Sequence, residues 1–340
     1  MHGRGPGFRK FVAGLALLLA MAGWGGVRAA DEIRYFTIGT AATSGTYFPI
    51  GALLASIISN PPGSRPCDVG GSCGVPGLIA VAQSTQGSVE NVKRIGAGTL
   101  QSALSQSDVA TWAYTGTGIF RKHAPIDNLR AIANLYPEDV HIVVRKDSGI
   151  GSIADLRGKR VSVGEQESGT LVEATEILKA YGIGLKNIKP SYDKPGHAAD
   201  RLAAGEIDAF FQVSGSPVMA VAELAQRVPI DLLPIPQDKA LEIIKSHPFL
   251  TISATLMDTY ENVGLTPTIS VGAIWVVAAD VDEELVYQIT RSLWNESNRT
   301  VLEQGHPKGF YIQPSTAVRG LAIPLHPGAE RYYREIGLIN

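Results

Sequence analysis

The sequence predicts an α/β protein with two lobes and a ligand cleft between them. A length of 340 residues suggests two domains. Apolar strand-like runs alternate with helical runs, a pattern typical of parallel sheets covered by helices. Loops rich in Gly, Ser and Thr follow several of these strands, and ligands of such sheets lie beyond the carboxyl ends of the strands.

Residues 1–30 are predicted to be a cleaved secretory signal. Arg4, Arg9 and Lys10 precede an apolar run from Phe11 to Trp24, and small residues follow before residue 30. The alternative is an uncleaved anchor, although the run is short for a span that needs about 20 residues. After removal of residues 1–30, the chain carries 26 basic and 32 acidic residues, a net charge of −6. We therefore expect an exported, periplasmic protein, and the acidic balance argues against a general nucleic-acid binder.

The first mature unit has a strand at Tyr35–Ile38 and a helix at Tyr47–Ile58. Between them lies the loop Thr43-Ser44-Gly45-Thr46. Hydroxyls and backbone N–H groups at a helix start can bind a carboxylate. Ordinary capping of the helix is the alternative.

The next two units continue the strand and helix alternation. A strand at 78–82 leads through the loop Ser84–Ser88 into a helix at 89–95, with Ser88 as its expected N-cap. A helix at 99–105 is then expected before a strand at 109–114, which ends in the glycine loop 115–118. All three loops are expected at the same edge of the sheet.

The remaining chain predicts a second α/β unit and a return to the first. The expected strands are 129–136, 140–145, 160–163, 207–213, 230–235 and 268–279. The expected helices are 171–181, 238–246, 282–304 and 328–336, with a helical turn at 153–159 and a further helix after Pro217. Lobe I is predicted at 31–142 plus 272–340 and lobe II at 143–271, joined by crossover strands near both boundaries.

Cys67 and Cys73 are the two cysteines of the chain, and their even number in an exported protein favours a disulfide. A zinc site would need further His or Cys ligands nearby. A redox motif would need the spacing C-x-x-C.

The combined motifs resemble the TAXI family of periplasmic solute-binding proteins, which serve TRAP transporters. The resemblance covers about residues 31–340 and rests on the segments 38–49, 83–91, 103–110, 135–138, 155–161, 164–170 and 323–333. It implies a type II periplasmic-binding-protein fold, in which hinge closure captures a small organic acid or amino acid. It also implies delivery of that ligand, of the glutamate, glutamine or C4/C5 dicarboxylate class, to a TRAP permease. The segment between Cys67 and Cys73 departs from the shortest family members.

The loops and the resemblance together predict the ligand-binding residues. These are Thr43, Ser44, Gly45, Thr46, Tyr47, Ser84, Thr85, Gly87, Ser88, Asn91, Gln106, Tyr136, Ser168, Gly169, Thr170 and Gln212. For the two tyrosines, packing in the core is the alternative, and Arg145 is expected on the solvated surface. Binding of charge is therefore expected to rely on neutral dipoles, which admits zwitterionic ligands.

We expect no catalytic residues, no metal site and no cofactor. The sequence contains neither His-Glu-x-x-His nor Gly-x-Ser-x-Gly, and the loop Gly164–Thr170 has no lysine of the Walker type. Two alternatives remain open: a ligand-sensing partner of a membrane receptor, and a transferase-type enzyme built on the same fold. The protein is expected to be a monomer.

Overall fold

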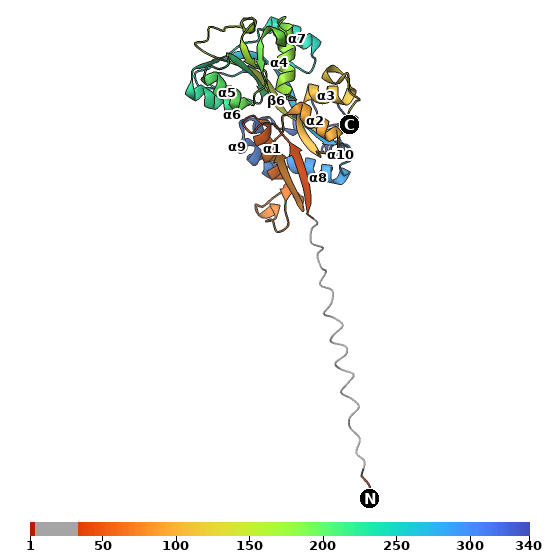
Figure 1. Cartoon of the computed structure of the whole chain (residues 1–340). Helices are drawn as coiled ribbons and strands as arrows, with labels where there is room; N and C mark the ends of the chain where they lie inside the picture. The colour runs from red at the N-terminus through yellow and green to blue at the C-terminus, as the bar shows by residue number, and fades with distance from the viewer. Residues whose placement is uncertain (4–32) are drawn as a thin grey trace. The chain divides into compact units, whose positions relative to one another are not determined.

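The computed structural model describes residues 1–3 and 33–340. The predicted signal segment therefore lies outside the described residues, apart from its first three. In the part of the chain that is described, no helix combines the length and apolar character that a membrane crossing requires. The residues from Ile33 to Asn340 form one unit (Figure 1), and the description below concerns that unit.

One mixed sheet organises this unit, with the strand order β4-β1-β5-β12-β6-β9-β7-β8. Strand β10 pairs with β6, and β11 pairs with β12. The strands of this sheet are β1 (Arg34–Gly39), β4 (Leu78–Gln83), β5 (Ser102–Gln106), β6 (Leu129–Arg145), β7 (Arg160–Ser162), β8 (Lys189–Ser191), β9 (Ala209–Ser214), β10 (Ile230–Leu232), β11 (Thr251–Thr255) and β12 (Thr266–Ala278). A separate pair is formed by β2 (Ser59–Asn60) and β3 (Val75–Pro76).

Helices cover this sheet in both halves of the chain (Figure 1). They are α1 (Tyr47–Ile58), α2 (Ser88–Gly96), α3 (Ser107–Thr115), α4 (Gly169–Ala180), α5 (Pro195–Ala203), α6 (Met219–Arg227), α7 (Gln237–Ser246), α8 (Glu283–Leu293), α9 (Glu296–Gly305) and α10 (Pro327–Glu335). Short 3-10 helices are η1 (Cys67–Val69), η2 (Gly118–Phe120), η3 (Ile153–Leu156), η4 (Leu185–Asn187), η5 (Pro307–Tyr311) and η6 (Pro314–Thr316).

The sheet has two parallel flanks around an antiparallel centre. Strands β4, β1 and β5 pair in parallel, and we call them, with α1–α3 and α8–α10, the first flank. Strands β9, β7 and β8 also pair in parallel, and with α4–α7 they form the second flank. The central strands β12 and β6 run antiparallel to each other and to the strands beside them. The predicted parallel arrangement therefore holds within each flank but not at the centre.

Strand β6 replaces the two strands that were predicted around Pro137. It runs without a break from Leu129 to Arg145. Proline is normally excluded from central strands because it cannot donate a ladder hydrogen bond. At Pro137, however, β6 is paired with β12 through Gly272, while its pairing with β9 begins only at Asp139. The proline thus occupies a local edge, where no neighbouring strand needs its missing N–H group.

The prediction for residues 99–118 was wrong, because strand and helix are interchanged. Residues 102–106 form β5, which is buried along its whole length between β1 and β12. Val109, Ala110 and Ala113 are buried on α3 at the spacing of one helix face. The glycine loop at 115–118 therefore follows a helix that ends at Gly116 in the left-handed conformation. It does not lie at the ligand edge of the sheet.

Three further differences concern the boundaries of elements. The single helix predicted at 282–304 is divided into α8 and α9, because Asn295 caps α9 by accepting a hydrogen bond from the Ser297 N–H at 2.9 Å. Helix α5 and strands β2, β3, β8 and β11 were not predicted. The other predicted strands and helices are present with small shifts at their ends, and α1 has the predicted bounds.

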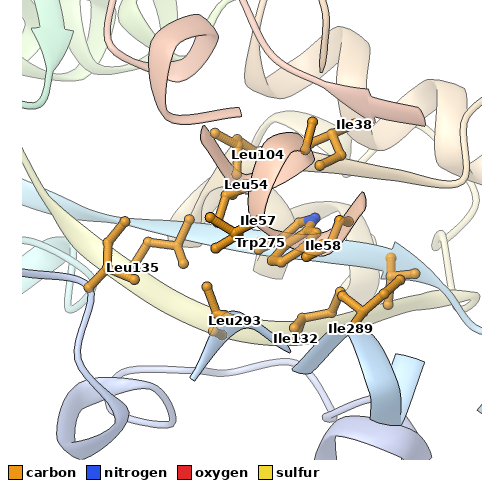
Figure 2. Close-up of a cluster of buried hydrophobic side chains, with 14 of the residues drawn as sticks. Ile38, Leu54, Ile57, Ile58, Leu104, Ile132, Leu135, Trp275, Ile289 and Leu293 are labelled. Atoms are coloured by element: carbon orange, nitrogen blue, oxygen red, sulfur yellow. The ribbon is translucent and has the colours of Figure 1, made fainter. Parts of the chain in front are cut away.

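The hydrophobic core divides into clusters on either side of the central strands. Trp275 of β12 is fully buried in the first flank and packs with Leu54, Ile57 and Ile58 of α1 (Figure 2). A second cluster packs α4 and α7 against β6, β7 and β9. The lobe boundaries at 142/143 and 271/272 stay a prediction; β6 runs through the first and β12 through the second as continuous strands.

The predicted disulfide between Cys67 and Cys73 is confirmed. It closes a short surface loop that contains η1, with the two Cα atoms 4.7 Å apart. Such a small loop restricts the unfolded chain only moderately.

Replacing both cysteines by serine is therefore expected to lower the free energy of unfolding by about 2 kcal/mol. The measurement is urea unfolding of the variant and of the oxidised protein, with the reduced protein as the matched control. A loss above about 5 kcal/mol would contradict a purely local role for this bridge.

Candidate functional site

A cavity of ≈ 50 Å³ lies where the loops of the two flanks meet. On the first flank it is bounded by the loop before α1, the start of α2 and the end of β5. On the second flank it is bounded by the start of α4, the segment before α5 and the end of β9. Ten of the sixteen predicted ligand residues line it: Gly45, Thr46, Tyr47, Gly87, Ser88, Gln106, Ser168, Gly169, Thr170 and Gln212.

The loop before α1 joins the two flanks. Thr46 is the N-cap residue of α1, but its side chain makes no capping hydrogen bond. Its backbone N–H instead donates to Ser214 Oγ at 3.2 Å, and its hydroxyl donates to the carbonyl oxygen of Gly215 at 2.6 Å. Ser44 Oγ accepts a hydrogen bond from the Gly196 N–H at 3.1 Å. The alternative that the Thr46 side chain caps α1 is thus wrong. Ser44 and Thr46 instead both contact the second flank.

The loop before α2 is held by its own polar groups. The Asn91 amide donates to the carbonyl oxygens of Thr40 and Leu104 at 2.7 and 2.8 Å. The Thr85 hydroxyl lies 2.8 Å from both Thr40 O and Asn91 Oδ1. The exposed Ser84 donates to Ala41 O at 2.9 Å. These three side chains position the loop and do not line the cavity; neither do Thr43, Ser44 and Tyr136.

Gly87 and Ser88 bring the start of α2 to the cavity. Gly87, not Ser88, is the N-cap residue, and its φ of 118° is a left-handed value that favours glycine. Ser88 Oγ accepts a hydrogen bond from the Gln106 N–H at 3.1 Å and lies 3.5 Å from the Tyr47 hydroxyl. The predicted capping role of Ser88 is therefore wrong, since its hydroxyl is used between α2, β5 and α1.

The start of α4 supplies the second-flank wall. Ser168 caps this helix, accepting a hydrogen bond from the Leu171 N–H at 3.1 Å. Thr170 Oγ1 accepts one from the Val213 N–H at 3.2 Å. A methyl group at Gly169 would overlap the side-chain amide of Gln106, which would have to move to admit it. The Oε1 atom of Gln106 is buried without a hydrogen-bond partner.

Three acidic side chains line the cavity, and the sequence did not single them out as ligand residues. They are Glu138, Glu165 and Asp193, and the lining contains no Lys or Arg. The three residues are far apart in the sequence, so no local motif contains them together. Only Glu138 could have been inferred from the sequence, because it lies two residues after the predicted ligand residue Tyr136 and therefore on the same face of the strand.

Glu138 is the most deeply buried of the three, with 1% of its surface exposed. Its Oε2 accepts a hydrogen bond from the Tyr47 hydroxyl at 2.7 Å. Burial raises the pKa of Glu138 to about 8, against the opposing effect of the Tyr47 hydrogen bond. Most Glu138 side chains are therefore protonated at neutral pH.

Glu165 and Asp193 differ in their partners. Burial raises the pKa of Glu165, and its carboxylate has no hydrogen bond or ion pair within the described part of the chain. Burial alone would raise the pKa of Asp193, but hydrogen bonds from Ser191 and Ser162 and the charge of Arg201 hold it below its usual value. Arg201 Nη1 lies 2.7 Å from Asp193 Oδ2. Glu165 is thus the carboxylate that is free to meet a ligand.

Two further groups of buried charges lie behind the cavity. Lys308 Nζ lies 3.6 Å from Asp139 Oδ2, and the two side chains are 5% and 6% exposed. Asp108 of α3 faces Glu173 of α4, and burial is the largest cause that raises the pKa of each. Both oxygens of Asp108 are buried without a donor, and the raised pKa of each carboxyl favours its protonated form.

The arrangement around Ser216 does not form a hydrolytic triad. Its hydroxyl donates to Asp139 Oδ2 at 2.7 Å and lies 3.2 Å from His141 Nε2. The other ring nitrogen of His141 faces the carbonyl oxygen of Gln212, whereas a triad places a carboxylate there. Within residues 33–340 and 1–3, no three His, Cys, Asp or Glu side chains are grouped to hold a metal ion.

Comparisons with solved structures find several ligand-binding proteins that resemble this chain. PhnD1 from Prochlorococcus marinus (MIT 9301), solved with methylphosphonate, is 12% identical; the match covers 90% of this chain and 99% of PhnD1 with a TM-score of 0.52. The periplasmic aliphatic sulphonate binding protein SsuA from Escherichia coli is 14% identical over 88% of this chain and 83% of its own, with a TM-score of 0.46. The ligand-binding component of an ABC-type import system from Staphylococcus aureus is 11% identical over 90% of this chain and 93% of its own, with a TM-score of 0.47.

The likeness to PhnD1 supports the predicted fold class, an α/β periplasmic-binding-protein fold built on a central sheet. At this identity, likeness to a solved structure concerns the fold alone. The sequence itself matches a family model from residue 38 to residue 337. This chain therefore belongs to the NMT1-like family.

Proposed function

We propose that this protein is an exported solute-binding protein that captures a small ligand between its two flanks and delivers it to a membrane permease. The observation that carries this proposal is a cavity whose walls come from both flanks and whose margin is tied by Thr46 to Ser214 and by Ser44 to Gly196. Further contacts hold the flanks together here: the Val89 and Glu90 N–H groups donate to Glu167 O, and Lys93 forms an ion pair with the Glu167 carboxylate.

The size of the cavity supports capture by closure. Ligand pockets commonly have volumes of about 300–1,000 Å³, whereas this cavity measures ≈ 50 Å³. A ligand of the amino-acid class must therefore enter while the flanks are apart. Such a ligand favours closure only if it binds the closed form more tightly than the open form.

We infer that the ligand is an amino acid, such as glutamine or glutamate, and not a dicarboxylate. The unpartnered carboxylate of Glu165 would attract a ligand ammonium group, and the ionised Asp193 would add repulsion against a second ligand carboxylate. The ligand carboxylate would lie toward the start of α4, where the helix dipole and N–H groups favour negative charge.

The partner that the TAXI resemblance implies is a TRAP permease, and the binding unit is taken to be a monomer. An ABC-type permease and a membrane receptor are the alternative partners. Co-purification of this protein with each of the three candidate membrane partners, co-expressed one at a time, distinguishes among them.

The ligand proposal is tested by a thermal-shift titration of the mature protein with glutamine, glutamate, succinate and 2-oxoglutarate. An amino acid at a hundred times its Kd is expected to stabilise the protein by about 2.7 kcal/mol. Stabilisation by succinate and not by either amino acid would overturn the proposed ligand class. No stabilisation by any of the four would overturn the proposed function.

Glu165→Gln is expected to weaken amino-acid binding about tenfold or more, because a charge-assisted hydrogen bond contributes about 1.5–3 kcal/mol. The matched control is Glu223→Gln, an exposed glutamate of α6. Equal affinities of the two variants in isothermal titration calorimetry would exclude Glu165 as the ammonium partner.

A further inference from the structure

A second and larger cavity, of ≈ 390 Å³, adjoins the same central strands. It is lined by Ser107 and Pro137, the chain neighbours of Gln106 and Glu138, which line the first cavity. Tyr136 and Pro137 line the second cavity and Glu138 lines the first, so this stretch of β6 borders both cavities.

The walls of this second cavity come from both flanks. Pro248 and Phe249 follow α7 of the second flank, while Tyr311 and Arg319 belong to the segment around η5 and η6 that packs on the first flank. Phe249 also contacts Trp112 of α3 edge to face, with ring centroids 6.1 Å apart. The cavity is thus a shaped space between elements distant in sequence, and not a groove along one helix.

Its size and lining are those of a small-molecule site. A volume of ≈ 390 Å³ falls within the range of about 300–1,000 Å³ that is typical of ligand pockets. Phe249, Tyr311 and Val271 offer apolar contact area. Among these walls lies Asn134, whose Oδ1 is buried without a hydrogen-bond partner. An unsatisfied buried acceptor is costly unless a donor reaches it.

Among the residues that line this cavity, Arg319 is the one with a charged side chain. Within the described residues its guanidinium forms neither an ion pair nor a side-chain hydrogen bond, in contrast to Arg145, Arg160 and Arg201. The cavity lining contains no acidic side chain. A guanidinium binds a carboxylate through two parallel hydrogen bonds, so an anionic group fits the Arg319 end.

We propose that this cavity is a second ligand site, which takes a small amphipathic carboxylate with an aromatic or branched aliphatic body. The carboxylate pairs with Arg319, the apolar body packs against Phe249 and Tyr311, and a hydroxyl or amide N–H on the ligand reaches Asn134. The second cavity thus favours an anionic group through Arg319, whereas the ionisable side chains that line the first cavity are all acidic.

The test is isothermal titration calorimetry of the mature protein with 4-hydroxyphenylacetate and with its uncharged analogue 2-(4-hydroxyphenyl)ethanol. The acid is expected to bind with one site and a Kd below about 1 mM, and the alcohol about tenfold more weakly. Arg319→Gln should remove this difference between acid and alcohol. Because Arg319 is exposed, the variant is expected to fold like the wild type.

Two control variants test whether the binding belongs to this cavity. Arg121→Gln removes another exposed arginine and should leave the affinity unchanged. Glu165→Gln alters the first cavity and should also leave it unchanged, whether or not the proposed amino-acid binding is correct. Phe249→Ala should weaken the acid and the alcohol alike; if this variant does not fold, Arg319→Gln alone decides. Absence of saturable binding, equal effects of Arg319→Gln and Arg121→Gln, or loss of binding in Glu165→Gln would each overturn the second site.

Discussion

Replacing Lys308 by methionine is expected to lower the free energy of unfolding by about 3–5 kcal/mol, the usual effect of removing one partner of a buried ion pair. Lys308 Nζ lies 3.6 Å from Asp139 Oδ2, and both side chains are almost fully buried. Without the ammonium group, the Asp139 carboxylate keeps only the hydroxyls of Ser216 and Ser253, which donate to it at 2.7 and 2.6 Å. Two neutral donors do not replace a charge in a buried site.

Urea unfolding of Lys308→Met measures this loss. The double variant Lys308→Met/Asp139→Asn should recover part of the stability, because it removes the unpaired buried charge while the amide can accept one hydroxyl and donate to the other. Lys245→Met at the exposed end of α7 is the matched control and should change stability by less than about 0.5 kcal/mol. A Lys308 variant as stable as this control would show that the ion pair contributes nothing.

Stability is also expected to fall as the pH rises from about 4.5 to about 8, because Glu138 has a raised pKa in the folded protein. Burial is the largest cause of the pKa of about 8; Asp108 and Asp139 raise it further, while the Tyr47 hydrogen bond and Lys308 oppose the shift. Between the unfolded and folded pKa values, the folded state holds a proton that the unfolded state has lost. The contribution is thus fully present below pH 4.5 and decreases by about 1.4 kcal/mol per pH unit in this window.

The pKa values of Asp108 and Glu173 are also raised, so this pair changes stability in the same direction. Unfolding free energies at pH 5, 6.5 and 8 measure the combined slope. Glu138→Gln should flatten it, since the amide does not titrate and can still accept the Tyr47 hydroxyl. Glu261→Gln, an exposed site, is the control and should keep the wild-type slope. Parallel curves for wild type and Glu138→Gln would show that Glu138 does not titrate in this window.

Local patterns were sufficient for the first strand, loop and helix after residue 33. The strand before Gly39, the Ser and Gly loop and the helix from Tyr47 follow one another as predicted, because apolar period and small-residue loops act over a few neighbours. The disulfide likewise follows from two cysteines in a short glycine-containing loop. The same reasoning failed at residues 99–118, where a buried strand of mostly small and polar residues has no apolar alternation to reveal it.

Which strands pair with each other in the sheet cannot be predicted from local sequence patterns. Pro137 could be accepted inside β6 only because β9 joins this strand two residues later, at Asp139. The antiparallel centre of the sheet also depends on which distant segments become neighbours. Helix α1 could be predicted from its own residues, whereas the pairing of β12 between β5 and β6 could not.

The fold class, the hydroxyl and glycine loops of both flanks and the disulfide could be predicted from the sequence alone, since each depends on residues close together in the chain. The contacts of Ser44 and Thr46 with Gly196 and Gly215, more than 150 residues away, arise only from tertiary packing. The same packing brings Glu138, Glu165 and Asp193 to one cavity and raises the pKa of Glu138. Burial and the charges nearby set a pKa, and both arise only when segments far apart in the chain pack together.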